Sequence, residues 1–274
     1  MTFIADLMNG LFDLLLKPFG GAAAWAMLAV AVVSGLIMLL LFKISTNQDK
    51  LVVAKRRLFG HIYEMGLYQD NLSVLFKIQR DLALANLKYL RVTFPALFAV
   101  LIPVVLILAQ LDSRFAHRPF QTGETALVTA ILESAQETLL TQLTLEAPDG
   151  VVVESMPVRD RVDLSATWRI RVDREGSYDL AVSAPGAESW TKQLTAGSGL
   201  PRLAKIRERA GLHHALLNPG EKPLPSDCPL TEISLQLPER ETRYAGVRMH
   251  WLLAFCVISL VFGLAVKDIF KVKI

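Results

Sequence analysis

The chain has 274 residues, of which 52% are hydrophobic and 20% are charged, and its formal net charge at pH 7 is +3. Its mean hydropathy of +0.38 is too high for an ordinary soluble protein, whereas its many charged residues exclude a chain made of membrane spans alone. The sequence therefore divides into apolar and polar parts.

Residues 1–21 predict an amphipathic helix that lies on the outer membrane surface. Apolar residues recur there at helical spacing: Phe3, Ile4, Leu7, Leu11, Leu14 and Leu15. Pro18 and Gly20-Gly21 then interrupt the pattern. The segment lacks the basic start of a signal peptide, so we expect the apolar stretch after it to be retained as a helix.

Three apolar stretches predict three transmembrane helices, at residues 22–42, 92–111 and 249–266. The first two carry no charge, and their 20 to 21 residues extend roughly 30 Å as helices, which matches the thickness of a bilayer core. The third has 18 residues, and His250 and Trp251 are expected at its membrane interface.

Residues 43–91 predict a cytoplasmic helical hairpin. Ser45 or Thr46 can cap its first arm, and Asp70 or Asn71 its second. Each arm has an apolar stripe by which the two can pack, formed by Leu51, Leu58, Ile62 and Met65 and by Leu72, Leu75, Phe76, Leu82 and Leu90. Pro95 is tolerated in membrane helices, so the second arm is expected to continue into the second span.

The distribution of basic residues predicts the orientation. Residues 43–91 hold nine Lys and Arg against four Asp and Glu, and the tail 267–274 holds three Lys against one Asp. Because cytoplasmic loops are enriched in Lys and Arg, we expect the N-terminus outside and the C-terminus in the cytoplasm. The predicted location is a bacterial inner membrane, crossed three times.

Residues 112–248 predict an extracytoplasmic antiparallel β-sandwich-like domain, because apolar and polar residues alternate with period two in several short runs. Residues 168–172 and 178–182 are expected to form a hairpin closed by residues 173–177, which include Glu175-Gly176. Pro201 to Gly211 carries the start and stop signals of one helix. The predicted fold class is thus membrane α + β.

No catalytic, metal or cofactor site is expected. The sequence contains no nucleophile, zinc or phosphate-loop motif, and His213-His214 with Cys228 lacks the spacing of a metal site. Cys228 and Cys256 fall at different depths, which disfavours a disulfide. The few polar residues within the spans argue against ion-coupled transport.

The basic residues of 43–91 leave two interpretations open. They can bind ribosomal RNA or anionic lipid, with the cluster Lys55, Arg56 and Arg57 as the candidate contact, or they can serve only to fix the topology. No binding to DNA is expected.

The order of these elements resembles the YidC-type insertase superfamily, in its three-span branch with archaeal YidC-like proteins and the insertase-like subunit of the ER membrane complex. The stretch that carries the resemblance runs from Ile44 to Leu108. The resemblance implies a membrane protein biogenesis factor with a groove open to the inner leaflet, which receives nascent membrane proteins or a ribosome. The candidate groove residues are Ser34, Lys43, Arg91 and Thr93. The 137-residue insertion 112–248 departs from the family pattern.

The alternative interpretation is a non-catalytic membrane-anchored scaffold that presents its periplasmic β domain to other envelope membrane proteins. A third interpretation, an envelope hydrolase, is disfavoured because the sequence offers no catalytic residues to assign to it. An insertase requires a hydrated inner-leaflet groove, whereas a scaffold requires a well-packed helix bundle and an apolar patch on its outer domain.

Overall fold

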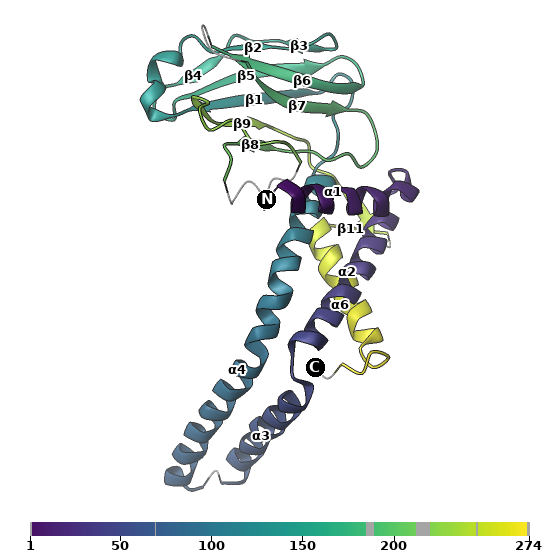
Figure 1. Cartoon of the computed structure of the whole chain (residues 1–274), viewed down its shortest axis with the longest axis vertical. Coiled ribbons are helices and arrows are strands. Elements are labelled where there is room, and N and C mark those ends of the chain that lie inside the picture. The colour runs from purple at the N-terminus through teal and green to yellow at the C-terminus, as the bar shows by residue number, and fades with distance from the viewer. Residues whose placement is uncertain (1, 69, 185–188, 212–219, 245, 273–274) are drawn as a thin grey trace. The chain divides into compact units, whose positions relative to one another are not determined.

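The computed structural model describes residues 2–68, 70–184, 189–211, 220–244 and 246–272. The chain folds into two compact units. The first unit combines Met1–Met27 with Leu106–Ala254, and the second combines Leu28–Val105 with Phe255–Ile274. Strands dominate the first unit and helices make up the second (Figure 1).

The first unit contains two packed antiparallel sheets. The larger sheet has the order β3-β5-β1-β9-β8, with β4 also paired to β5, and the smaller has the order β2-β6-β7. The strands of the larger sheet are β1 (Thr125–Leu132), β3 (Val151–Val153), β4 (Val158–Asp160), β5 (Ser165–Val172), β8 (Ile206–Glu208) and β9 (Leu230–Leu235). Those of the smaller sheet are β2 (Thr144–Glu146), β6 (Gly176–Ser183) and β7 (Trp190–Ala196). The predicted antiparallel β-rich region is confirmed.

A separate two-stranded ribbon, β10 (Thr242–Tyr244) with β11 (Val247–Met249), follows the larger sheet in the chain. The first unit also contains short 3-10 turns at η1 (Lys17–Phe19) and η3 (Ser134–Leu139).

Alternate residues of both sheets form the core of the β domain. On β5 the buried positions are Ala166, Trp168, Ile170 and Val172, with Trp168 only 2% exposed. The period of two therefore identifies the inward face of this strand correctly. Leu180 of β6 contributes to the same core from the other sheet.

The predicted hairpin between β5 and β6 is wrong, because the two strands belong to different sheets. The connection does not close on itself: the backbone N–H groups of Asp173 and Arg174 donate to the carbonyl of Gly150, at 2.8 and 3.3 Å. Residues 173–175 thus carry the chain from the larger sheet to the smaller, and they are held by the loop between β2 and β3. The Glu175-Gly176 turn signal marks a crossing between sheets.

The predicted helix from Pro201 to Gly211 is also wrong. The backbone N–H of Leu203 donates to the carbonyl of Ser113 at 2.7 Å, and β8 then pairs with β9. Pairing along the edge of the larger sheet therefore overrides the local helix signals.

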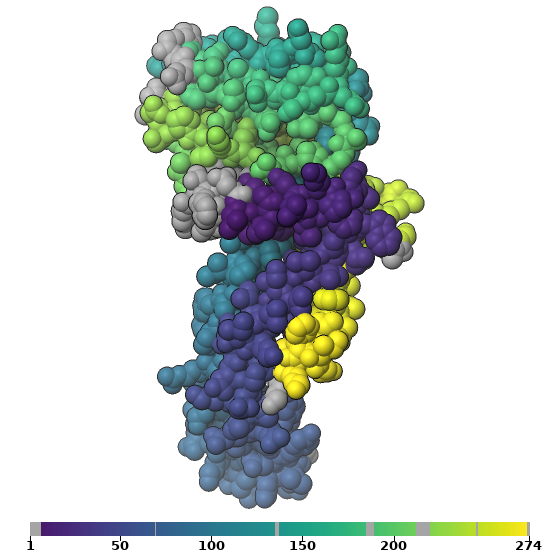
Figure 2. Space-filling view, turned by 45° about the vertical axis from the view of Figure 1, so that its right-hand side comes forward, coloured from purple at the N-terminus to yellow at the C-terminus, as the bar shows by residue number. Residues whose placement is uncertain are grey.

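Helix α1 (Thr2–Leu16) is amphipathic, as predicted, and its two faces differ in exposure. Phe12 and Leu16 are 7% exposed and pack against the first unit. Leu7, Leu11 and Leu14 are 52 to 72% exposed and form an apolar outer stripe. In the space-filling view α1 is the purple surface of this unit beneath the green strands (Figure 2).

Helix α2 (Ala23–Ser45) leads into α3 (Gln48–Leu67), which pairs with α4 (Leu72–Leu111) as an antiparallel hairpin (Figure 1). Asn47 caps α3, because its side chain accepts from the backbone N–H of Lys50 at 3.1 Å. The expected cap at Ser45 or Thr46 is therefore wrong by one or two residues. Asn71 caps α4 as predicted, by accepting from Val74 at 3.3 Å.

The second arm continues into the apolar stretch as predicted. Helix α4 runs unbroken for 40 residues through Pro95 and Pro103, and a π-helical segment, η2 (Asp112–Ala116), follows it. Helices α2 and α4 are long and apolar enough to cross a membrane. Helix α6 (Trp251–Val266) is shorter, at 16 residues, because Met249 belongs to strand β11.

The apolar stripes of the hairpin differ in part from those expected. On α3, Leu51 is buried and Leu58 and Met65 are half-buried, but Ile62 is 41% exposed. On α4 the shielded residues recur at spacings of three and four: Leu75, Ile78, Leu82 and Ala85. These residues form one stripe along α4, as expected for a helix with a single shielded face. The expected members that lie off this stripe are exposed, namely Leu72, Phe76 and Leu90.

Candidate functional site

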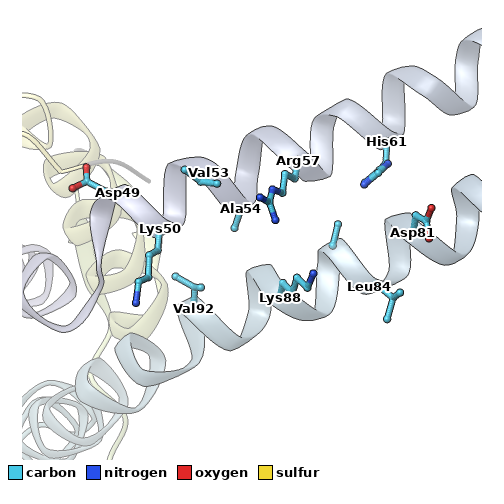
Figure 3. Close-up of a pocket in the computed structure, with 11 residues that line it drawn as sticks. Asp49, Lys50, Val53, Ala54, Arg57, His61, Asp81, Leu84, Lys88 and Val92 are labelled. Atoms are coloured by element: carbon cyan, nitrogen blue, oxygen red, sulfur yellow. The ribbon is translucent and has the colours of Figure 1, made fainter.

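An open cleft of about 580 Å³ lies between α3 and α4 (Figure 3). Its walls mix charged and apolar side chains. The lining consists of Asp49, Lys50, Val53, Ala54, Arg57, His61, Asp81, Leu84, Ala85, Lys88 and Val92. This cleft cannot be found as a site from the sequence, because only the pairing of the two arms brings these residues together.

Three cations reach the cleft from both walls. Lys50 and Arg57 come from α3 and Lys88 comes from α4, and Figure 3 shows Arg57 and Lys88 extending toward the space between the helices. The carboxylate of Asp81 already pairs with Arg80 at 3.2 Å. Among the described residues, none of the three cations forms an ion pair, so their charge is available to a ligand.

The opposite side of α3 borders a second hollow, of about 680 Å³, which Lys55 and Arg56 line together with Lys267. The three predicted contact residues Lys55, Arg56 and Arg57 are therefore divided between two surfaces. Successive helical residues are 100° apart, so Arg57 cannot share a face with Lys55.

The four candidate groove residues lie in different environments. Ser34 is only 3% exposed, and Gly35 beside it meets α6 so closely that an added Cβ would lie 2.9 Å from the carbonyl oxygen of Ser259. The hydroxyl of Thr93 donates to the carbonyl of Tyr89 at 3.0 Å. Ser34 thus belongs to a tight crossing of α2 and α6, and Thr93 satisfies its hydroxyl within its own helix.

The two candidate groove cations are both exposed. Lys43 lies in the last turn of α2, and Arg91 lies on α4 directly before its apolar stretch. Lys43 is thus accessible at the end of α2, and Arg91 is accessible in the middle of α4, where its apolar stretch begins.

The apolar part of α4 is scarcely covered by the rest of the chain. Only 17% of its most apolar window is buried, against 39% for α2. Its exposed side chains are large: Phe94, Leu97, Phe98, Leu101 and Ile102. Exposure of each pair of these side chains to water would cost several kcal/mol of free energy. This face therefore requires lipid or another apolar chain as its neighbour.

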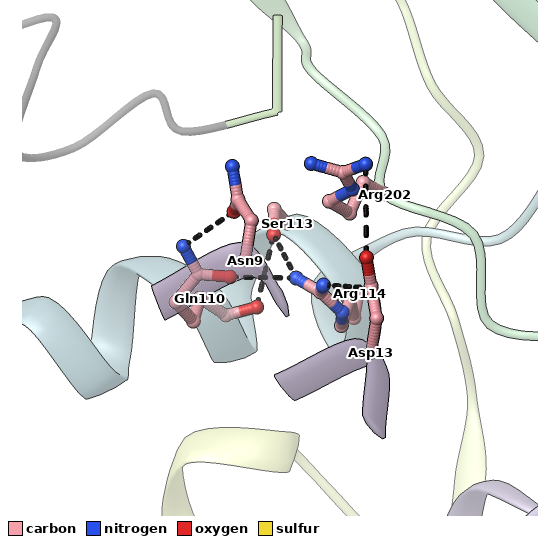
Figure 4. A network of polar contacts seen from close by, with 6 residues as sticks. All are labelled: Asn9, Asp13, Gln110, Ser113, Arg114 and Arg202. Carbon is pink, nitrogen blue, oxygen red and sulfur yellow. Dashed lines mark hydrogen bonds and ion pairs between the residues drawn. The ribbon is translucent and has the colours of Figure 1, made fainter. Parts of the chain in front are cut away.

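A second polar site lies in the first unit, where α1 meets the end of α4 (Figure 4). The guanidinium of Arg114 donates to Gln110 Oε1 at 2.7 Å and to the carboxylate of Asp13. The amide of Gln110 donates to Asn9 Oδ1 at 2.8 Å. Arg202 adds a longer contact to Asp13, at 3.7 Å.

Arg114 is the centre of this network. Its side chain is 1% exposed and also lies over the ring of Phe12, at 5.7 Å from the centroid. A buried guanidinium is tolerated only where its donors are satisfied, and here an acid, an amide and an aromatic face share that task. The network fastens α1 to the end of α4 within the first unit.

The β domain contains a second buried cation. Lys192 of β7 is fully buried, and its ammonium donates to the carboxylate of Glu221 and to the carbonyl of Ala204 at 2.7 Å. Burial lowers the pKa of Lys192, and Glu221 opposes that shift. The pair ties β7 to the segment before β9 and is structural.

The remaining reactive side chains do not converge. Cys228 is buried, its Sγ accepts from the backbone N–H of Leu230 at 3.4 Å, and burial raises the pKa of its thiol. Cys256 is exposed on α6. His213 and His214 lie outside the described residues, and within those residues no group of three His, Cys, Asp or Glu side chains could hold a metal.

One edge of the larger sheet exposes apolar side chains. Met156, Val158 and Val162, on and around β4, are 72 to 90% exposed. All three residues of β4 are exposed, and the strand pairs only with β5 among the described strands. Such an edge can accept an added strand from another chain.

No protein-family model matches the chain, and no curated protein matches it either.

Proposed function

We propose that the protein is a YidC-like membrane protein biogenesis factor, which shields short apolar segments of client proteins at the uncovered face of α4. The observation that carries the proposal is the apolar part of α4, which is only 17% buried and begins directly after Arg91. A client segment could exchange lipid contacts for contacts with Phe94, Leu97 and Leu101 there. Lys43 and Arg91 would attract its acidic flank.

We also propose a location and an orientation for the protein. The protein resides in a bacterial inner membrane, with α2, α4 and α6 as spans, the hairpin and C-terminus in the cytoplasm and the β domain outside. The excess of Lys and Arg on α3 and α4 supports this orientation. At 16 residues α6 extends about 24 Å, so its span requires local thinning of the bilayer or adjacent turns.

The orientation predicts a labelling pattern. In a background with Cys228→Ala and Cys256→Ala, a cysteine at Lys77 should react with a membrane-impermeant maleimide only after the membrane is opened. A cysteine at Ser198 should react in intact spheroplasts, because Ser198 is exposed on the β domain. Labelling of Ser198 only from the cytoplasmic side would refute the orientation.

Site-specific photo-crosslinking tests the function. A photoreactive residue at Leu97 or Leu101, which are exposed on α4, or at the half-buried Thr93 one turn earlier, should capture short nascent membrane proteins. Capture should fall by about tenfold in the variant Lys43→Glu/Arg91→Glu, which repels acidic flanks. A photoreactive residue at Leu260 of α6, which is 63% exposed, serves as the control for random contact with membrane proteins.

The control defines what would refute the proposal. Equal capture at Leu260 and Leu97 would mean that α4 contacts clients no more than any lipid-facing helix. Capture of one stable partner, with no nascent chains, would also reject client shielding and would favour the scaffold.

The exposed edge at β4 favours the scaffold as the second candidate function. Its apolar residues Met156, Val158 and Val162 fit an extended segment of an envelope protein that adds a strand to the larger sheet. In that case Val158→Pro should abolish co-purification of the partner, since proline cannot donate to a strand and disfavours pairing. Under the insertase proposal the same change should leave nascent-chain capture unaltered.

A further inference from the structure

We infer that the cleft between α3 and α4 binds the phosphate headgroup of an anionic phospholipid, held by Lys50, Arg57 and Lys88. The headgroup site lies in the cleft lined by residues 49–92, before the client-shielding face of α4, and only the acyl chains of the lipid would reach that face. It requires only that α4 enters the bilayer after Arg91, and it stands or falls independently of client capture.

The charges within the cleft call for an anion. Arg57 and Lys88 extend from facing helices toward the same space, and like charges so placed repel each other. Asp81 is engaged by Arg80, and among the described residues no acid pairs with Lys50, Arg57 or Lys88. A phosphate between the walls would relieve this repulsion, with the planar Arg57 guanidinium suited to two parallel hydrogen bonds.

The position of the cleft favours a lipid over a free phosphate. Lys88 lies four residues before Val92, the first residue of the apolar stretch, which corresponds to about 6 Å along the helix. The headgroup layer extends about 5 to 7 Å beyond the hydrocarbon core. Lys88 is thus at headgroup depth, and Figure 3 shows Lys50 on the facing helix beside Val92.

The apolar part of the lining also fits a lipid. Val53, Ala54 and Leu84 line the cleft beside the cations, and Val92 lies at its membrane end. Beyond Val92 the exposed face of α4 begins with Phe94 and Leu97. A lipid seated with its phosphate between the helices could therefore lay its acyl chains along α4, a contact that inorganic phosphate cannot make.

The first test compares lipids on the full-length protein by native mass spectrometry, in a neutral detergent with equal amounts of phosphatidylglycerol and phosphatidylcholine. Wild type should retain phosphatidylglycerol at least about tenfold better. The variant Lys50→Gln/Arg57→Gln/Lys88→Gln should lose this preference. All three side chains are exposed, so their replacement should leave the helical circular dichroism and the elution volume unchanged.

A matched variant removes three other cations of the hairpin, Lys55→Gln/Arg56→Gln/Lys77→Gln, and should keep the preference. Equal loss in both variants would show diffuse attraction to a basic surface and would overturn the site. Equal retention of the two lipids by wild type would overturn it as well. Displacement of the lipid by inorganic phosphate at the same concentration would overturn the assignment to a lipid.

A second measurement needs no variant. Photoactivatable phosphatidylglycerol, with the reactive group next to the phosphate, should label peptides within 48–57 and 81–92 of the wild-type protein in vesicles. Even labelling of the lipid-facing parts of α2, α4 and α6 would contradict the inferred site.

Discussion

Replacement of Glu221 by alanine is expected to destabilise the β domain by about 3 to 5 kcal/mol, because it leaves the fully buried ammonium of Lys192 without its counter-charge. The midpoint of urea unfolding, followed on the full-length protein by protease cleavage of the β domain, measures this loss. The double variant Lys192→Met/Glu221→Ala should recover most of it, because an apolar side chain of similar length needs no partner.

The pH dependence distinguishes a charge effect from lost packing. The pKa of buried Lys192 lies below 10.5, its ordinary value, and without Glu221 it should fall further. At pH values between the pKa of Lys192 in the folded chain and its pKa in the unfolded chain, the unfolded chain binds more protons. The free energy of unfolding therefore rises with pH in this range. The loss in Glu221→Ala should therefore shrink as pH rises toward 10. An equal loss at pH 7 and pH 10 would mean that packing causes it.

An exposed ion pair gives the matched control. Glu154 pairs with Arg171 at 2.7 Å on the surface of the larger sheet, where both side chains are partly exposed. Glu154→Ala should cost less than about 1 kcal/mol, because solvent screens such pairs. If Glu154→Ala and Glu221→Ala lowered the stability of the β domain by similar amounts, burial of the Lys192–Glu221 pair would not be the cause of the loss.

Replacement of Trp168 by aspartate is expected to unfold the β domain altogether. Trp168 is 2% exposed in the core between the two sheets. The change removes a large buried side chain, which costs about 3 to 5 kcal/mol, and introduces a carboxylate without a partner. The sum is comparable with the whole stability of a small domain. Loss of near-ultraviolet circular dichroism and rapid proteolysis of residues 124–243 would report it.

Trp168→Phe serves as the control, since it keeps an apolar ring in the core and should leave the domain folded with a lower urea midpoint. A folded domain in Trp168→Asp, with wild-type resistance to protease, would place this side chain in solvent and contradict the register of β5.

The sequence predicts the helices better than the sheets for a physical reason. Hydrophobic length, caps and periodicity are local, so α1, the hairpin and the unbroken α4 could be predicted. The alternation on β5 likewise identifies its buried face. Strand partners depend on distant residues, so the assignment of β5 and β6 to different sheets could not be predicted, and neither could the pairing of β8 with β9.

Only part of the candidate site could be predicted from the sequence. Lys43 and Arg91 are exposed, as a groove would require, but Ser34 is buried at the crossing with α6. Composition indicates that the hairpin is basic, whereas the surface on which each cation lies depends on how the two arms pair. The pairing places Arg57 and Lys88 in one cleft and leaves Lys55 on the other side of α3.

The attachment of α1 has a consequence for the order of events during synthesis. Asn9 and Asp13 bind Gln110 and Arg114, each 101 residues later in the chain. At translation rates of about 5 to 20 residues per second, these partners follow α1 out of the ribosome by about 5 to 20 s. During that interval α1 lacks these partners. In the proposed membrane orientation, its outer leucines, Leu7, Leu11 and Leu14, would hold the young chain at the bilayer until Gln110 and Arg114 are made.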